Sequence, residues 1–552
     1  MGNIITRISL ALRLLVELDE EYHAVEARLK HSPGLPVANP TVPLWTVPPS
    51  PIAKHRPDAL PRHADVVIIG SGITGTSVAR TLLDHASERE EKGSARNADR
   101  LSVVMLEARD VCSGATGRNG GHINPPLFHD FPELESRHGL DVARQIIRFR
   151  LAHLPALRRV AEEEDAFEIS QIRDVESLDV HYERATFEKA VAALNVWKKD
   201  MPDESQGVYV LEGGEAIQSP FKFGLALQTV GCIVTPAGAA HPYRLVTSIL
   251  SNLLKRYPTN FHLSTQTPCT HIDAPSATTP LYTVHTSQGT LTTPHIVHAT
   301  NGWTPHLLAP LRTKILPVRG LMSAQRPGQS LSTHSTHHGA RSHIFYAGPT
   351  GYDYLTQLPL GEHELMFGGG AAQGGRTILP EVGNADDSGY NMAIASHISG
   401  ALPEYFGADH WGREGTPQED NDAQVMWRRG RVKGLWTGIL GISVDGLPWV
   451  GRVPEKVSGR RAPSGAAVSG PKTGTELEGA PPPMTPPGEW MSAGYSGEGM
   501  VNAWMCGRAL ACMMLGREAE REARLREWFP DVMRVTEKRW RKASLEDFAS
   551  RF

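Results

Sequence analysis

The chain has 552 residues, of which 40% are hydrophobic, enough apolar material for a large core and more than one domain. A formal net charge of −4 and a pI near 6.7 exclude the basic balance typical of proteins that bind nucleic acid or anionic membranes. The five cysteines include no C-x-x-C pair, which predicts free thiols in a reducing, cytoplasmic compartment.

Residues 1–63 are expected to form an N-terminal helix and a connector. Apolar residues recur in steps of four and three from Ile4 to Leu29, which predicts one amphipathic helix over residues 3–30. We expect it to pack on its own protein, with a coiled coil or a membrane anchor as alternatives. Residues 36–61 are proline-rich and predict an extended connector. The first six residues fit a loose N-myristoylation pattern that many termini match by chance, and no apolar run reaches the ~18 residues of a transmembrane helix.

The most informative motif follows the connector. Residues 66–69 are an apolar run typical of a buried strand, and Gly70, Gly72 and Gly75 come next in G-x-G-x-x-G spacing. Residues 76–84 then predict a helix. The first glycine permits a tight turn, the second lets a pyrophosphate approach the backbone, and the third lets the helix pack on the strand. The helix N-terminus attracts phosphate, so this pattern predicts a dinucleotide site.

A second buried strand is predicted at 101–106, and it ends at Glu107. A carboxylate at this point can accept hydrogen bonds from a ribose 2′-OH. The spacing is longer than usual because residues 85–100 are polar and charged, which predicts a surface loop. An acid here, with no arginine, favours FAD or NAD over NADP.

The stretch from Ser113 to His122 reads SGATGRNGGH, and Arg118 within it is placed to contact a pyrophosphate or a flavin ring. This stretch resembles the R-x-G-G element of FAD-dependent amine and amino-acid oxidoreductases. The chain as a whole resembles the D-amino-acid oxidase superfamily, within it the glycine oxidase, sarcosine oxidase and gamma-glutamylputrescine oxidase branch. The likeness continues in order through most of residues 64–516.

Two later stretches extend the resemblance. Residues 295–302 (HIVHATNG) match the second FAD signature of that superfamily, a strand that ends in a small-residue turn near the pyrophosphate. Residues 494–500 (GYSGEGM) open a final helix, expected over 501–515, whose N-terminus faces the flavin in the superfamily. Many relatives have His at the position of Glu498, and some have Lys at that of Val501. These departures put a simple amino-acid carboxylate pocket in doubt, although Arg319 or Arg376 could replace the lysine.

The resemblance implies an α/β fold, with a Rossmann-type FAD-binding domain and a discontinuous α+β substrate domain built on a mostly antiparallel sheet. We expect the FAD-binding domain at 64–130, 236–315 and 430–516, and the substrate domain at 131–235 and 316–429. A helical tail is expected at 517–552. Residues 454–488 predict a mobile loop, and residues 325–343 a solvated loop whose histidines lack the companions of a metal site.

The implied function is FAD-dependent oxidation of a C–N bond in a small amine or amino acid. A hydride passes to the flavin, the product is an imine, and oxygen is the favoured acceptor, giving peroxide. The alternatives are a dehydrogenase that uses another acceptor and a flavin-bearing interaction protein with marginal turnover. FAD is expected to bind non-covalently, because residues 434–445 lack the cysteine that some relatives use for attachment.

Three residues are candidates for catalysis. Tyr352 and Tyr354 alternate onto one face of a strand, with ordinary sheet packing as the alternative. His306 follows the second FAD signature, where a protonated imidazole could assist oxygen reduction, or it is simply a surface histidine. The candidate cofactor-binding residues are Gly70, Gly72, Ile73, Thr74, Gly75, Glu107, Ser113, Thr116, Arg118, Asn119, Gly120, Gly121, Thr300, Asn301, Gly302, Gly497, Gly499 and Met500.

Overall fold

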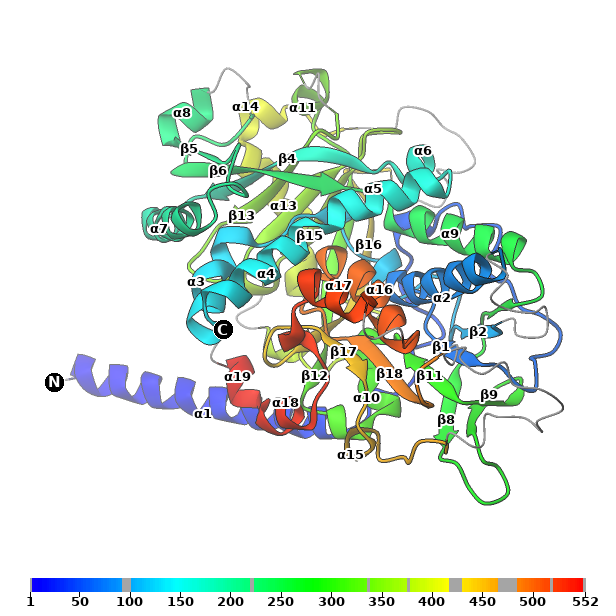
Figure 1. Cartoon of the computed structure of the whole chain (residues 1–552). Coiled ribbons are helices and arrows are strands. Elements are labelled where there is room, and N and C mark those ends of the chain that lie inside the picture. Colours follow the sequence, from blue (N-terminus) through cyan, green and yellow to red (C-terminus); the bar gives the residue numbers. More distant parts are fainter. Residues whose placement is uncertain are drawn as a thin grey trace.

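Two large sheets organise the protein, and a small three-stranded sheet packs beside one of them (Figure 1). The computed structural model describes residues 2–91, 101–218, 223–334, 338–374, 378–415, 429–464, 484–516 and 520–549. The mixture of a parallel sheet covered by helices and a largely antiparallel sheet confirms the predicted α/β fold class.

The six-stranded sheet has the order β17-β18-β11-β1-β2-β7. All neighbours in it run parallel except β17 and β18. The strands are β1 (Val66–Ile69), β2 (Val103–Leu106), β7 (Phe261–Ser264), β11 (His295–His298), β17 (Trp449–Arg452) and β18 (Gly488–Ala493). The β1 and β2 strands are buried throughout, as expected of parallel strands covered on both faces.

The two faces of this sheet are covered differently because successive side chains alternate between them. Val66 and Ile68 pack in the cluster that includes three helices, α2 (Ile73–Glu91), α9 (Pro242–Arg256) and α16 (Ala503–Met514). Val67 and Ile69 pack instead against the small antiparallel sheet. That sheet is formed by β8 (Cys269–Asp273), β9 (Tyr282–Thr286) and β10 (Gly289–Thr293).

The second large sheet has nine strands, in the order β16-β12-β15-β14-β13-β4-β6-β3, with β5 on β6. Its pairs are antiparallel except β13 with β4. The strands are β3 (His122–Ile123), β4 (Arg173–His181), β5 (Tyr209–Glu212), β6 (Gly231–Ala239), β12 (Ile315–Gln325), β13 (Arg341–Tyr346), β14 (Asp353–Gln357), β15 (Leu365–Gly369) and β16 (Val432–Ser443). Helix α13 (Met392–Phe406) packs on this sheet through a separate apolar cluster.

The other helices lie around these sheets. They are α1 (Gly2–Lys30), α3 (Leu127–His138), α4 (Leu140–Leu151), α5 (His153–Glu163), α6 (Phe167–Ser170), α7 (Arg184–Asp200), α8 (Gly213–Gln218), α10 (Thr304–Leu307), α11 (Gln329–His334), α12 (Ala371–Gly374), α14 (Ala408–Trp411), α15 (Glu455–Ser458), α17 (Glu520–Trp528), α18 (Glu537–Lys542) and α19 (Leu545–Ala549). Among the described residues, none of these helices combines the length and the hydropathy that crossing a bilayer requires.

The N-terminal segment is one helix followed by a well-packed connector. The prediction of a single helix is confirmed by α1, whose N-terminal part projects from the body in Figure 1. Near its C-terminal end, Val25 and Leu29 are buried in an apolar cluster of the body. In the connector, Trp45 is only 1% exposed, donates its indole N–H to the Asn119 carbonyl and lies 4.5 Å from the His241 ring. The connector is therefore part of the folded core.

Three loop predictions need correction. The surface loop expected at 85–100 starts later, because α2 continues to Glu91; residues 92–100 lie outside the described residues. The solvated loop expected at 325–343 contains α11 and the start of β13, where His343 is buried and burial lowers its pKa to about 3. The mobile loop expected at 454–488 begins with α15, and Arg460 pairs with Glu489 at 2.7 Å; residues 465–483 are not described.

A buried charge cluster ties the two sheets to the connector. Asp387 pairs with the Arg109 guanidinium at 2.9 Å and with Arg118 Nε at 3.5 Å, and its side chain is fully buried. Its backbone carbonyl accepts from the Thr41 amide at 2.8 Å. Thr41 Oγ1 in turn accepts from the Thr437 amide at 2.9 Å. Four distant segments therefore meet at one carboxylate.

We expect Asp387→Ala to destabilise the protein by about 3–5 kcal/mol, because it leaves buried guanidinium charge uncompensated. Denaturant unfolding of the two proteins measures the difference. Asp386→Ala is the matched control, since that neighbouring carboxylate is exposed and its loss should cost about 0.5 kcal/mol or less. Equal losses in both variants would contradict a special role for Asp387.

Candidate functional site

The glycine turn after β1 is dictated by close backbone approaches. Gly70 has a φ of +111°, and a Cβ there would lie 2.5 Å from the Ala299 carbonyl oxygen. A Cβ on Gly75 would lie 2.0 Å from the Gly70 oxygen. Neither position has room for a side chain. A Cβ on Gly72 would meet only Thr116 Oγ1, at 3.1 Å, so Gly72 leaves the start of α2 accessible.

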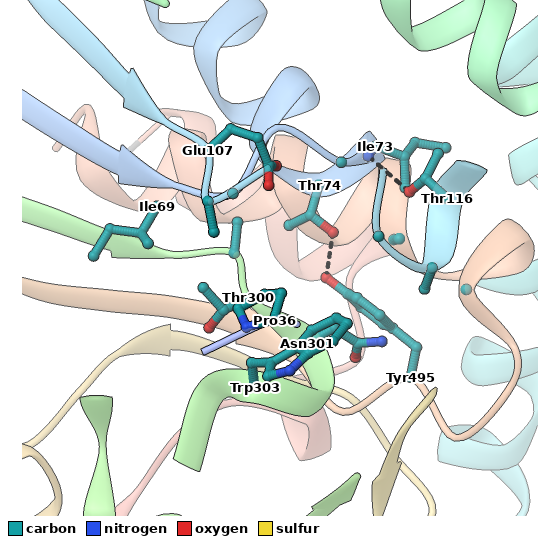
Figure 2. A pocket seen from close by; sticks show the side chains of 18 of the residues that line it. Pro36, Ile69, Ile73, Thr74, Glu107, Thr116, Thr300, Asn301, Trp303 and Tyr495 are labelled. Carbon is teal, nitrogen blue, oxygen red and sulfur yellow. Dashed lines mark hydrogen bonds between the residues drawn. The ribbon is translucent and has the colours of Figure 1, made fainter. Parts of the chain in front are cut away.

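Two side chains from distant segments hold the first turn of α2 (Figure 2). The Ile73 amide donates to Thr116 Oγ1 at 3.1 Å, and Thr74 Oγ1 lies 2.7 Å from the Tyr495 hydroxyl. Tyr495 also contacts Ser492 Oγ at 2.8 Å. The helix N-terminus, which favours phosphate, is thereby fixed against the loops on either side.

Glu107 follows β2 directly, and its carboxylate is held in place by backbone and hydroxyl donors. Oε2 accepts from the Ser71 amide at 3.1 Å and from Ser71 Oγ at 2.6 Å. Oε1 accepts from the Arg109 amide at 3.1 Å. The side chain lines the same cavity as the glycine turn, where a ribose could bind it.

One cavity runs along the carboxyl ends of β1, β2 and β11 and reaches the loop before α16. Thirteen of the predicted site residues line it. They are Gly70, Gly72, Ile73, Thr74, Glu107, Thr116, Asn119, Thr300, Asn301, His306, Gly497, Gly499 and Met500. The structure thus brings together segments that the sequence separates widely.

Other predicted residues lie behind this wall and act in packing. A Cβ on Gly120 would come 2.7 Å from the Tyr354 ring, one on Gly121 2.2 Å from the Ala240 oxygen, and one on Gly302 2.6 Å from the Leu440 oxygen. Gly75 packs within the glycine turn, as described above. The backbone oxygen of Ser113 accepts from Arg118 Nε at 2.8 Å.

The expectation that Arg118 contacts the cofactor is corrected. Its side chain is 3% exposed, and it pairs with Asp387. Its Nη1 also donates to the Thr437 carbonyl at 2.7 Å. Burial lowers its pKa to about 10, so it stays charged near neutral pH, but its charge is used in the buried cluster.

Several lining residues escaped sequence reasoning. Gly34, Leu35 and Pro36 of the connector line the cavity, as do Trp303 and Tyr495. Tyr495 lies inside the recognised GYSGEGM stretch, which was the available signal for it. Nothing in the proline-rich composition of the connector indicated that it reaches the cavity, because that depends on its path over the folded body.

The cavity suits FAD. It begins with a phosphate-favouring helix N-terminus and a fixed carboxylate, and it extends to a second glycine-containing loop, residues 497–499. Two buried donor or acceptor atoms of lining residues, Trp303 Nε1 and His306 Nε2, have no hydrogen-bond partner among the described residues. A polar ligand would satisfy them, as buried polar groups require.

His306 is linked to the N-terminal segment. Its Nδ1 lies 2.9 Å from Ser32 Oγ. Burial, followed by the charge of Arg312, lowers its pKa below the usual value. The imidazole is therefore neutral at neutral pH, which does not favour the predicted role as a cation.

The predicted catalytic tyrosines form a cluster with a third tyrosine. We call Tyr346, Tyr352 and Tyr354 the tyrosine cluster. The rings of Tyr346 and Tyr352 lie 5.9 Å apart. The Tyr346 hydroxyl contacts His129 Nε2 at 2.9 Å, and the Tyr354 hydroxyl donates to Met322 Sδ at 2.9 Å. Tyr354 packs on Gly120, so the cluster adjoins the segment that leads from the cavity.

Comparison with known proteins agrees with this geometry. The family of FAD dependent oxidoreductases named DAO matches residues 65–513. The chain belongs to this family. The protein is thus an FAD-dependent oxidoreductase, and its resemblance to the superfamily is confirmed.

Solved structures share its fold. L-proline dehydrogenase from P. horikoshii covers 88% of this chain and 100% of its own, with a TM-score of 0.56 and 17% identity. Glycine oxidase from Geobacillus kaustophilus covers 83% and 99%, with a TM-score of 0.54 and 16% identity. L-amino acid deaminase from Proteus myxofaciens covers 91% and 96%, with a TM-score of 0.54 and 14% identity. At these identities the likeness concerns the fold.

Curated relatives match over shorter stretches. The gamma-glutamylputrescine oxidoreductase of Escherichia coli (strain K12) is 33% identical over 82 residues, 15% of this chain and 16% of that protein. The anaerobic glycerol-3-phosphate dehydrogenase of the same strain contributes one polypeptide that is 25% identical over 265 residues, 47% of this chain and 42% of that polypeptide. The matched regions span less than half of either relative.

We expect Glu107→Ala to weaken FAD binding by about 1.5–3 kcal/mol, the range for a hydrogen bond to a charged group. Fluorescence titration of apoprotein with FAD measures the affinity. Ser71→Ala is the matched control, because it removes the 2.6 Å bond to Glu107 but keeps the carboxylate in the cavity. If Ser71→Ala weakens binding as much as Glu107→Ala, the carboxylate serves the turn and contacts no ribose.

For His306, the lowered pKa gives a pH-dependent expectation. His306→Leu should leave the rate of reoxidation by oxygen unchanged at pH 8, where the wild-type imidazole is neutral. Any difference should emerge only as the pH falls below the ordinary histidine pKa of about 6.5. Stopped-flow reoxidation of the reduced holoenzyme across pH checks this. A slower variant at pH 8 would show that the neutral side chain itself matters.

Proposed function

We propose that the protein oxidises a C–N bond of a small amine or amino acid, with FAD as the hydride acceptor. The observation that carries the proposal is the tyrosine cluster beside the FAD cavity, where the buried carboxyl of Glu498 lies between two cavity-lining glycines. The names of several similar proteins, among them glycine oxidase, L-proline dehydrogenase and gamma-glutamylputrescine oxidoreductase, agree with a nitrogen-bearing substrate.

The chain's own residues divide the work along the cavity. Glu107 and the α2 N-terminus would hold the ribose and the pyrophosphate. Asn119, Gly497 and Met500, at the other end of the cavity, are placed to position the ring. The tyrosine cluster would present the substrate and exclude water. FAD supplies the redox chemistry when bound, and the protein supplies binding, orientation and electrostatics.

Charge at the cluster argues against a phosphate-bearing substrate, the kind named in the glycerol-3-phosphate dehydrogenase relative. Among the described residues, the arginine whose charge acts on Glu498 is Arg150, and it is already paired with Asp130 at 2.8 Å. Arg319, a candidate carboxylate partner, pairs with Glu381 at 2.7 Å. Arg376, the other candidate, lies outside the described residues. A substrate without an anionic group therefore fits best.

Two alternatives concern the fate of the electrons and the existence of turnover. A dehydrogenase would pass electrons to a carrier in place of oxygen, and the named relatives include both oxidases and dehydrogenases. A flavin-bearing interaction protein would bind FAD but reduce it at a marginal rate. The projecting part of α1 would suit such docking.

Anaerobic mixing of oxidised holoenzyme with a panel of amines and amino acids tests the function. At least one amine should bleach the yellow flavin absorbance within a few turnovers, and admission of air should then restore it with formation of peroxide. Restoration by a quinone but not by air would identify a dehydrogenase. If no member of the panel bleaches the flavin, the proposal is wrong and the interaction protein is favoured.

A further inference from the structure

We propose that Glu498 binds a non-reacting ammonium group of the substrate, so that the enzyme acts on an α,ω-diamine or a longer polyamine. This inference rests on the function proposed above and narrows its substrate class. It places a positive charge, separated by an alkyl chain from the carbon that is oxidised, at the tyrosine cluster.

The position of Glu498 is the first observation. Its neighbours Gly497 and Gly499 both line the FAD cavity. On its other side, its charge is the largest electrostatic influence on the hydroxyls of Tyr352 and Tyr354. Glu498 therefore stands at the junction of the cavity and the tyrosine cluster, where a substrate must pass or bind.

The second observation is that its carboxylate is unsatisfied. The backbone of Glu498 is bonded, its amide to the Tyr495 oxygen at 2.8 Å and its carbonyl to Asn502 Nδ2 at 2.9 Å. No hydrogen bond or ion pair of its side chain occurs within the described part of the chain. Burial raises the pKa of this carboxyl to about 7, which records a charge that lacks compensation.

The charge balance around Glu498 is the third. Asp130 and Glu498 share one arginine, Arg150, which donates to Asp130 at 2.8 Å. The other nearby carboxylate, Asp179, contacts His129 at 2.9 Å. One negative charge is left over, and a bound cation would neutralise it.

Aromatic surface completes the site. Tyr352 is 45% exposed, although burial raises the pKa of its hydroxyl, so it leaves ring surface for a ligand deep in the protein. Tyr346 stacks on His181 at 4.6 Å, and His181 Nε2 is buried with no partner among the described residues. Burial lowers the pKa of His181 to about 4, so it stays neutral and can accept a hydrogen bond from an ammonium. Tyrosine rings around a carboxylate bind alkylammonium groups through cation–π attraction.

A non-reacting ammonium fits better than the reacting amine. Hydride loss requires a neutral amine with a free lone pair, and a paired carboxylate stabilises the protonated form. Glu498 would therefore slow the chemistry if it held the reacting nitrogen without taking its proton. At the far end of a diamine, the same carboxylate adds affinity without that cost.

Stopped-flow reduction under anaerobic conditions tests the proposal with α,ω-diaminoalkanes of three to six carbons and with 1-aminobutane as the matched monoamine. Glu498→Gln should raise the saturation constant for the preferred diamine by about 10–100-fold, the effect of losing one charge-assisted hydrogen bond. The maximal reduction rate, the flavin spectrum and the constant for 1-aminobutane should change little. Glu498→Asp should restore part of the diamine affinity, and Glu215→Gln, an exposed change on α8, is the control.

The pH dependence gives a second readout. Calorimetric binding of the diamine to oxidised holoenzyme should tighten as the pH rises through about 7 and should release a proton below that pH. On the elements packed nearby, burial keeps His122 and His153 neutral, with pKa values of about 3 and 4. Asp130, Arg150, His129 and Asp179 are the remaining charged or titratable groups there. The dependence should vanish in Glu498→Gln, and its persistence would assign it to one of them.

Three results would overturn the inference. One is a wild-type enzyme that holds 1-aminobutane as tightly as every diaminoalkane, which needs no variant to observe. Another is equal diamine affinity with and without the Glu498 carboxylate. The third is an equal loss of maximal reduction rate for both kinds of amine in Glu498→Gln, which would make Glu498 a proton acceptor for the reacting nitrogen. If diamine binding depends on Glu498 but no amine bleaches the flavin, the proposed function fails and the binding site stands.

Discussion

The contact between the end of β1 and the end of β11 is the constraint on which the rest of the site depends. At Gly70 the two backbones approach so closely that a Cβ would lie 2.5 Å from the Ala299 oxygen. Beyond this contact the chain turns into α2 on one side and into residues 300–303 on the other. The cavity lies between these diverging loops, at the carboxyl ends of parallel strands. Any side chain at position 70 would separate the strands that define it.

The wall of the cavity is assembled from segments far apart in sequence. The connector supplies residues 34–36, the second strand supplies Glu107, and the last helical segment supplies Gly497 to Met500. Hydrogen bonds between these segments, such as Thr74 to Tyr495, tie the wall together. An elongated cofactor would therefore stabilise many tertiary contacts at once, by mass action on the folded state.

Charge separates the two ends of the site. Near the glycine turn, Arg109 and Arg118 are neutralised by the buried Asp387, and the Glu107 carboxylate is held by Ser71. Near the tyrosine cluster, carboxylates outnumber arginines and Glu498 has no side-chain partner within the described residues. Because burying an uncompensated charge is costly, the structure retains it where a ligand can supply the missing partner. The two ends thus suit different ligands.

The sequence by itself determined the parts whose chemistry is local. The strand, glycine turn, helix, strand and terminal acid of residues 66–107 follow each other directly, so spacing and residue type predict both their structure and the dinucleotide site. The order of the later motifs likewise predicted the fold class and most of the cavity lining, including Thr300, Asn301 and Met500. Only backbone conformation and short-range hydrogen bonds are needed for such features.

Only the tertiary structure decided which polar groups are available to a ligand. Arg118 looked free in the sequence, but it is bound to Asp387, and the connector looked like a spacer, but it lines the cavity. His343 looked solvated and is buried in a strand. Each outcome depends on contacts between distant segments, because burial and ion pairing are set by what packs against a residue and not by its neighbours in the chain.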